Sequence, residues 1–288
     1  MQALLFYITY PFIYAVASLP YGALYRLSDV FCFFVRLIGY RKEVIFKNLR
    51  TSFPDKTERE ISKLARDYYR YFCDLTLETL KTLRMPEDES RDRVTLENVE
   101  LFHKLHRENK SVILVLGHYG NWEWIGPCVT LHTPYQLNVI YRPLTNPYFE
   151  RMMVRMRTRF GTRITPVPQT LRDMVATRGT VTATAFVADQ AAPVNAYWTT
   201  FLNQDTSVFT GPEKLATKFN YPVVYLHVER PKRGYYTVRP ELLFETPAQT
   251  QPDEISEKFT RRLEKDIITY PPIWLWSHKR WKHARPTA

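Results

Sequence analysis

Residues 111–123 constrain the fold of this chain more than any other segment. Val112 to Leu116 form a short apolar run rich in branched residues, which predicts a buried β-strand. Gly117 ends the run, His118 follows at once, and Glu123 comes five positions later. His118 is therefore expected at the C-terminal end of a core strand, where open α/β sheets place their functional sites.

The neighbours of His118 favour a catalytic pair over a chance proximity of two polar residues. Gly120 permits a tight turn or the close approach of a ligand to the backbone. Trp122 and Trp124 flank Glu123 and supply apolar surface that excludes water. A histidine here can accept the proton of an alcohol while a carboxylate holds its ring. We expect Glu123 to be that carboxylate.

The remaining patterns alternate between strands and helices and predict an α/β fold. Thr57 and Glu60 have the spacing of a capping box and should begin a helix that runs to about residue 83, and Thr210 with Glu213 should begin another. A further helix is expected over residues 97–109. Further strands are predicted over residues 136–141, 180–187, 221–229 and 235–244, the last two joined by a Pro-Lys-Arg-Gly turn. We therefore expect a mixed-sheet α/β sandwich.

Composition narrows the possible partners. The net charge of +11 suits nucleic acid, an anionic membrane or an acidic partner, but no nucleic-acid-binding signature appears. Aromatic residues make up 15% of the chain, which suits a lipid interface. The three cysteines have neither disulfide nor metal spacing. No glycine-rich nucleotide motif is present, so we expect no cofactor and no metal.

The N-terminus indicates contact with a membrane. Residues 1–25 carry no charged side chain, and their length is about that of a bilayer-spanning helix. A basic cluster follows at Arg36, Arg41, Lys42, Lys47 and Arg50, which places the body of the protein on the cytoplasmic side. We expect a membrane-anchoring helical segment over residues 1–40 and a catalytic domain over residues 41–288. Spanning the bilayer, lying in one leaflet and packing as a core helix all remain open.

Five sequence blocks in order resemble one enzyme family. Residues 118–123 fit the HX4E form of the HX4(D/E) signature of glycerolipid-type acyltransferases. The other blocks are Arg41 to Asn48 with Phe53-Pro54, Tyr141-Arg142-Pro143 with Asn146-Pro147, Ala188-Asp189-Gln190, and Trp274 to Lys282. Together they resemble the lipid A biosynthesis late acyltransferases, the lauroyl and myristoyl transferases of bacterial endotoxin assembly. After Gln190 the chain lacks the glycine that many members carry, which bears on the identity of the acceptor.

The resemblance implies roles for individual residues. His118 would be the general base, oriented by Glu123. Arg142 would bind an acceptor phosphate or support the oxyanion, although pairing with a structural carboxylate is the alternative. Asp189 and Gln190 would position the acceptor, with a cap or loop hydrogen bond as the alternative. Asn121 and Tyr119 would orient the substrate.

Two basic segments remain open to more than one interpretation. Arg151, Arg155 and Arg159 recur every four residues, so a helix would align them on one face. In the tail, Trp274, Trp276 and Trp281 alternate with cations such as Arg280. Either segment suits a lipid phosphate or an acidic carrier protein, and either suits a solvated surface.

The expected function is transfer of a fatty acyl chain from acyl carrier protein to a hydroxyl of a lipid A-type glycolipid precursor. The enzyme would work at the cytoplasmic face of the cell inner membrane, with acyl-CoA as the other possible donor. Two alternatives remain: the same chemistry on an aminolipid or another glycolipid, and a non-catalytic lipid-binding membrane protein.

Overall fold

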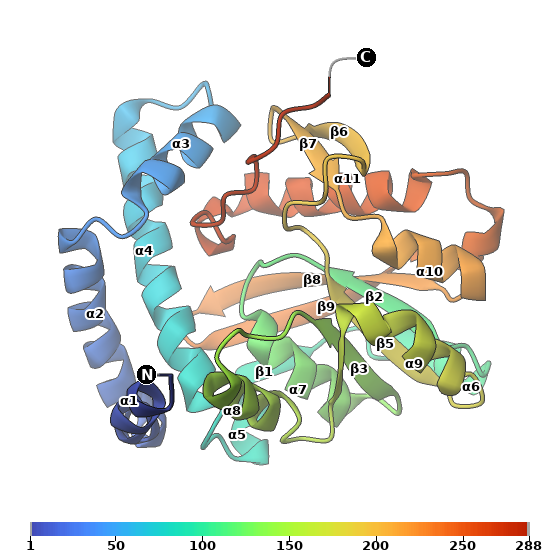
Figure 1. Cartoon of the computed structure of the whole chain (residues 1–288), viewed down its shortest axis with the longest axis horizontal. Coiled ribbons are helices and arrows are strands. Elements are labelled where there is room, and N and C mark those ends of the chain that lie inside the picture. The colour runs from blue at the N-terminus through green and yellow to red at the C-terminus, as the bar shows by residue number, and fades with distance from the viewer. Residues whose placement is uncertain (1, 287–288) are drawn as a thin grey trace.

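A computed structural model describes residues 2–286, and it opens with a group of helices beside an α/β body (Figure 1). The group consists of α1 (Gln2–Ser18), α2 (Tyr21–Leu37), α3 (Lys42–Ser52) and α4 (Glu58–Lys81). Pro20 precedes α2 and separates it from α1, because proline is well suited to the start of a helix but interrupts a continuous one. The expected capping box is present on α4, where Thr57 and Glu60 bond each other's backbone N–H groups.

The helices of this group differ in how much surface they bury. Within α1 only Ala17 is buried among the described residues. α2 buries Leu24, Ser28, Cys32 and Val35, and it packs along α4. In the part of the chain from residue 2 to residue 286, no helix combines the length and apolarity needed to cross a bilayer.

The body is built on a mixed seven-stranded sheet in the order β1-β9-β8-β2-β5-β3-β4. Its strands are β1 (Val94–Leu96), β2 (Val112–Leu116), β3 (Gln136–Tyr141), β4 (Arg163–Pro166), β5 (Thr182–Val187), β8 (Val223–Lys232) and β9 (Tyr235–Phe244). Neighbouring strands are parallel except for the β8–β9 hairpin. The mixed-sheet α/β sandwich expected from the sequence is confirmed. The strand β2 lies at the centre and is buried along its whole length, as its apolar run predicts.

Helices cover both faces of the sheet. They are α5 (Glu87–Arg93), α6 (Glu100–Arg107), α7 (Trp122–His132), α8 (Pro147–Arg157), α9 (Thr170–Ala176), α10 (Gly211–Phe219) and α11 (Glu254–Thr269). α10 and α11 lie on one side, and α7 lies on the other with α8 beyond it (Figure 1). Three short 3-10 turns, η1 (Val167–Gln169), η2 (Pro247–Gln249) and η3 (Pro271–Ile273), and a small hairpin of β6 (Tyr197–Phe201) and β7 (Gln204–Val208) complete the body.

One expected capping box is not formed. Thr210 precedes α10 as predicted, but its side chain makes no capping bond. Glu213 instead is buried and accepts hydrogen bonds from the backbone N–H and the hydroxyl of Ser256, at the start of α11. The carboxylate therefore ties α10 to α11 rather than closing its own helix, because tertiary contacts outweigh a local capping bond.

Candidate active site

The site centres on a hydrogen-bonded pair, His118 and Asp189. β2 and β5 are parallel neighbours, with Leu116 opposite Val187. Each strand carries its polar residue two positions beyond that pair, so both emerge at the same edge of the sheet. The ring Nδ1 of His118 lies 2.6 Å from Oδ1 of Asp189. Both side chains are largely shielded from solvent, with 16% of His118 and 4% of Asp189 exposed.

Asp189 is held as an anion. Burial opposes its ionisation, but the charge of His118 and hydrogen bonds from His118 and Trp274 outweigh burial and lower the pKa of Asp189 to about 2. The indole N–H of Trp274 donates to Oδ2 over 2.8 Å. Since an ionised carboxylate only accepts, Nδ1 of His118 must carry the proton.

This arrangement leaves Nε2 of His118 as the basic nitrogen. The side-chain amide nitrogen of Gln190 lies 3.2 Å from Nε2 and donates a hydrogen bond to it, so an acceptor hydroxyl would have to replace this amide to reach Nε2. The Trp122 ring meets the imidazole edge-to-face, with 4.9 Å between ring centroids. An imidazole whose Nδ1–H is fixed by a carboxylate and whose Nε2 is unprotonated has the geometry of a general base.

The structure corrects the predicted partner of His118. Glu123 lies in the first turn of α7 and accepts two hydrogen bonds from Arg157 of α8, at 3.0 and 2.7 Å. No hydrogen bond joins Glu123 to His118 within residues 2–286. The first turn of α7 presents the carboxylate to α8, whereas parallel strand pairing delivers Asp189 from 71 residues away. Glu123 and Arg157 thus fix α7 against α8 beside the histidine.

Arg142 follows β3 directly and lies at the same edge of the sheet as His118, since β3 is parallel to β5. Its side chain is exposed and makes no hydrogen bond or ion pair within the described chain. The alternative expectation, that Arg142 pairs with a structural carboxylate, is therefore not met within the described chain. A guanidinium in this position is available to an anionic ligand.

Tyr119 and Asn121 have other partners than a substrate. The Tyr119 hydroxyl donates to the backbone carbonyls of Asp266 and Tyr270, at 3.0 and 3.1 Å. Asn121 is fully buried, caps α7 through the N–H of Trp124, and donates to Glu78. Both residues therefore hold the loop around His118 in place, and the expectation that they orient substrate is not supported by their positions.

The C-terminal block contributes more to the site than its sequence suggested. Trp274 and Trp276 are buried rather than displayed to a bilayer. Nε2 of His278 lies 3.4 Å from the backbone nitrogen of Ala191. Burial, only partly offset by Asp189, lowers the pKa of His278 to about 4, so this ring is neutral near pH 7. The tryptophans and histidine at fixed spacing were the available signal, but the hydrogen bond from Trp274 to Asp189 was not readable from them.

Arg280 is a buried cation next to the same aspartate. It is 4% exposed, and one guanidinium nitrogen donates to the backbone carbonyl of Ser207 over 2.7 Å. Its Nε and Nη1 have no hydrogen-bond partner within residues 2–286. Burial lowers the pKa of Arg280 to about 10 although Asp189 opposes the change, so the group stays charged near pH 7. A fixed positive charge beside Asp189 favours its ionised form.

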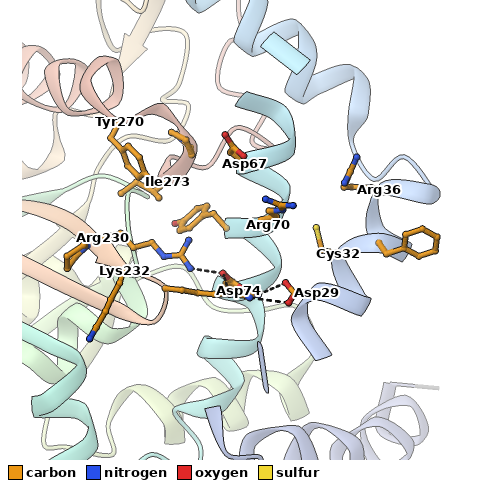
Figure 2. Close-up of a pocket in the computed structure, with 15 residues that line it drawn as sticks. Asp29, Cys32, Arg36, Asp67, Arg70, Asp74, Arg230, Lys232, Tyr270 and Ile273 are labelled. Atoms are coloured by element: carbon orange, nitrogen blue, oxygen red, sulfur yellow. Dashed lines mark hydrogen bonds and ion pairs between the residues drawn. The ribbon is translucent and has the colours of Figure 1, made fainter. Parts of the chain in front are cut away.

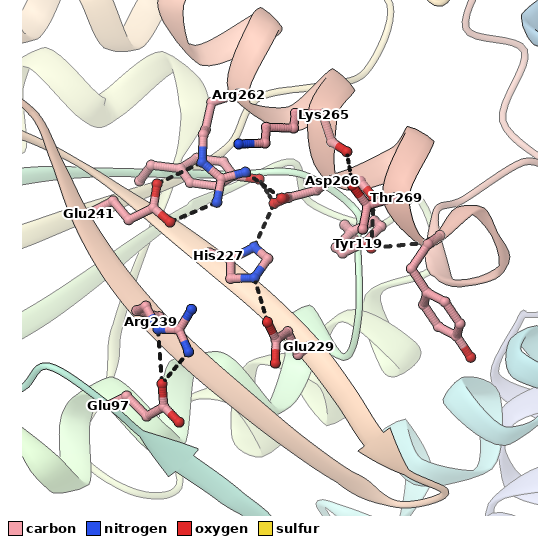
Figure 3. Close-up of polar contacts among 12 residues, drawn as sticks. Glu97, Tyr119, His227, Glu229, Arg239, Glu241, Arg262, Lys265, Asp266 and Thr269 are labelled. Atoms are coloured by element: carbon pink, nitrogen blue, oxygen red, sulfur yellow. Dashed lines mark hydrogen bonds and ion pairs between the residues drawn. The ribbon is translucent and has the colours of Figure 1, made fainter.

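A second histidine–aspartate pair lies elsewhere, on β8 (Figure 3). His227 contacts Asp266 through Nδ1 at 2.8 Å and Glu229 through Nε2 at 3.1 Å. The hydrogen bond to Asp266 is the main reason that the pKa of His227 is raised. Asp266 also accepts from Tyr225 and Arg262. Because carboxylates occupy both ring nitrogens of His227, no basic nitrogen remains free, and His118 is the better base.

Comparison with known proteins identifies the family. The family model described as bacterial lipid A biosynthesis acyltransferase matches residues 1–283. Two curated relatives are a lipid A biosynthesis palmitoleoyltransferase of Escherichia coli (strain K12) and a lipid A biosynthesis acyltransferase of Shigella flexneri. Each is 25% identical over 276 residues, which cover 93% of this chain and 88% of the relative. The chain therefore belongs to the bacterial lipid A biosynthesis acyltransferase family and is an acyltransferase of lipid A biosynthesis.

Proposed function

We propose that the enzyme transfers a fatty acyl chain from the thioester of acyl carrier protein to a hydroxyl of a lipid A-type glycolipid precursor. His118 acts as the general base, and Asp189 orients it. The observation that carries this proposal is the 2.6 Å contact between Nδ1 and Asp189, which leaves Nε2 unprotonated and bonded only to the neutral amide of Gln190.

The chemistry follows from that geometry. Nε2 of His118 takes the proton of the acceptor hydroxyl as its oxygen attacks the thioester carbonyl. Asp189 stabilises the imidazolium that forms, because an ionised carboxylate lies against Nδ1. When the tetrahedral intermediate collapses, the C–S bond breaks and the thiolate takes the proton from His118. The amide of Gln190 positions the acceptor hydroxyl near Nε2.

The charge distribution supports the choice of donor and acceptor. A net charge of +11 suits both an acidic carrier protein and a phosphorylated acceptor. Arg142 is exposed and unpaired at the edge of the sheet that carries His118, so it binds a phosphate of the acceptor in this proposal.

The N-terminal segment supports a location at the cytoplasmic face of the inner membrane. On α1, Leu4, Leu5, Ile8 and Phe12 are more than half exposed, and on α2 so are Val30, Phe33, Phe34 and Leu37. Exposed apolar stripes of this length are typical of helices that insert into one leaflet. Residues 1–40 form the membrane-associated segment in this proposal, and residues 41–288 form the acyltransferase domain.

A reconstituted transfer assay tests the proposal. Purified protein receives acyl carrier protein or coenzyme A loaded with the same acyl chain, and a lipid A precursor, an aminolipid or another glycolipid as acceptor. We expect transfer from acyl carrier protein to the lipid A precursor, and loss of that transfer in His118→Gln. Transfer only to another acceptor would replace the acceptor assignment. Vesicle binding without transfer to any acceptor would support the non-catalytic alternative.

A further inference from the structure

A groove lies where α2, α3 and α4 meet, apart from the site described above. It has a volume of about 580 Å³. Its walls are largely apolar, and three cations and the hydroxyl groups of Ser62 and Tyr69 lie among them. The lining residues are Phe33, Arg36, Leu37, Lys42, Phe46, Ser62, Ala65, Arg66 and Tyr69.

The three cations of this groove lack partners in the protein. Arg36 comes from α2, Lys42 from α3 and Arg66 from α4, and all three are exposed. None of them forms a hydrogen bond or ion pair through its side chain within residues 2–286, and no carboxylate lines the groove. Three like charges brought together from separate helices repel one another, and a bound anion relieves that repulsion.

Two other members of the same basic cluster already have partners in the protein. Arg41 donates to the backbone carbonyl of Ser277 over 2.8 Å. Arg50 pairs with Glu58 at 2.7 Å. Within this cluster Arg41 and Arg50 are bonded to the protein and Arg36 and Lys42 line the groove, while Lys47 does neither within residues 2–286. Arg66, from outside that cluster, also lines the groove.

A larger neighbouring cavity has a different charge balance (Figure 2). It measures about 670 Å³ and shares Phe33 and Arg36 with the groove. Three carboxylates line it, and the buried Asp74 accepts from both Arg230 and Arg233. These carboxylates offset part of the cavity's positive charge, whereas the lining residues of the groove include no carboxylate, so the groove is the better place for an anion.

The apolar side of the groove indicates what carries the anion. Phe33 and Leu37 line it and are also 62% and 70% exposed. They belong to the exposed stripe of α2 that Val30 and Phe34 continue. A free phosphate would neutralise the cations but leave this stripe in water, whereas a lipid covers both.

From these contacts we infer that the α2–α4 groove binds the phosphate headgroup of an anionic membrane lipid, with the acyl chains along the α2 stripe. This inference rests on the membrane association in the proposed function, and it adds a lipid site separate from the catalytic one. Arg36, Lys42 and Arg66 hold the phosphate, because clustered basic side chains recognise anionic headgroups.

Vesicle flotation of the full chain tests the inference. The vesicles contain phosphatidylcholine alone or phosphatidylcholine with phosphatidic acid. The variant Lys42→Gln/Arg66→Gln should bind the acidic vesicles about thirtyfold more weakly, since each basic residue at a membrane contributes a factor of about five. Neither residue has a bonded partner in the structure, so the variant should fold normally.

A matched control removes the same charge elsewhere. Lys104 and Arg107 are exposed on α6, at the opposite end of the molecule from α2 (Figure 1). Lys104→Gln/Arg107→Gln should lower binding by about threefold at most, because screening limits their reach. Equal losses in both variants would overturn the inference, since binding would then follow net charge alone.

Two further measurements complete the test. One distinguishes a lipid phosphate from free phosphate, and the other distinguishes the lipid site from the proposed acyl transfer. Inorganic phosphate should compete poorly with phosphatidic acid vesicles, and complete displacement by it would overturn the lipid assignment. Equal binding of wild type to both vesicle types would overturn the headgroup site while leaving acyl transfer in detergent intact. If the protein shows no acyl transfer but still prefers the acidic vesicles, the proposed reaction is wrong and the lipid site in the groove is supported.

Discussion

Replacing Asp189 with asparagine tests whether the carboxylate is needed to orient His118, because the variant keeps a polar side chain at position 189. Asparagine has nearly the same shape, so the contact with Trp274 can persist. Its amide group can donate a proton toward Nδ1, which favours the tautomer with the proton on Nε2. In that tautomer the nitrogen that should accept the proton of the alcohol is already protonated.

The size of the effect follows from the contact distance and burial. Nδ1 and Oδ1 are 2.6 Å apart in a site where Asp189 is 4% exposed. Two unit charges about 4 Å apart interact by about 4 kcal/mol at an effective dielectric constant of about 20. Losing that stabilisation of the imidazolium slows transfer about 10³-fold, and the wrong tautomer extends the loss toward about 10⁴-fold.

The assay is single-turnover transfer from acyl carrier protein to the lipid acceptor, with circular dichroism to verify the fold. We expect Asp189→Asn to lower the rate of the chemical step and to leave acceptor binding close to wild type. A rate within about tenfold of wild type would refute the orienting role of Asp189, because general-base contributions usually exceed that.

Three other predictions concern stability. Because the folded protein lowers the pKa of Asp189, this carboxylate contributes about 2 kcal/mol to the free energy of unfolding above pH ~4, and the contribution is lost as the pH falls toward 2. In urea titrations the difference in stability between wild type and Asp189→Asn should therefore shrink on acidification. Glu123→Gln should lower the free energy of unfolding by about 2 kcal/mol, because it leaves Arg157 without its carboxylate. It should slow transfer less than Asp189→Asn does, and equal slowing would argue for a direct role of Glu123. Gly120→Ala should cost about 3 kcal/mol, since Gly120 has φ +67° and an added Cβ would lie 2.4 Å from a methyl group of Val228; an unchanged melting temperature would contradict this.

Local patterns predicted much of the body. The strands β2, β3 and β5 and the β8–β9 hairpin match the predicted runs, because buried strands carry a strong apolar signal. The short edge strands β1 and β4 and the β6–β7 hairpin were not predicted, since three to five residues carry too little periodicity.

The site could be predicted only in part. His118 was identifiable because it follows an apolar strand directly. Its partner depends on β5 lying next to β2, and strand order is a property of the whole sheet. The nearest carboxylate in sequence, Glu123, was therefore chosen over the nearest in space, Asp189. The same limit applied to Trp274 and Arg280, whose role depends on the tail folding back onto that edge.

The arginine run shows why helical spacing alone was insufficient. α8 ends at Arg157, so Arg159 lies beyond it and donates to the backbone carbonyl of Thr82. Arg157, which is outside the four-residue series, makes the contact with Glu123. The four-residue spacing therefore did not identify the arginine that lies beside the site.

Mass spectrometry of the lipid extract from cells that lack this gene tests the central claim most directly. The cells are complemented with wild type, with His118→Ala or with Asp189→Asn. We expect one lipid A-type glycolipid to lose a single acyl chain, wild type to restore it, and His118→Ala to fail. Equal restoration of that chain by wild type and by His118→Ala would contradict the assignment of His118 as the general base.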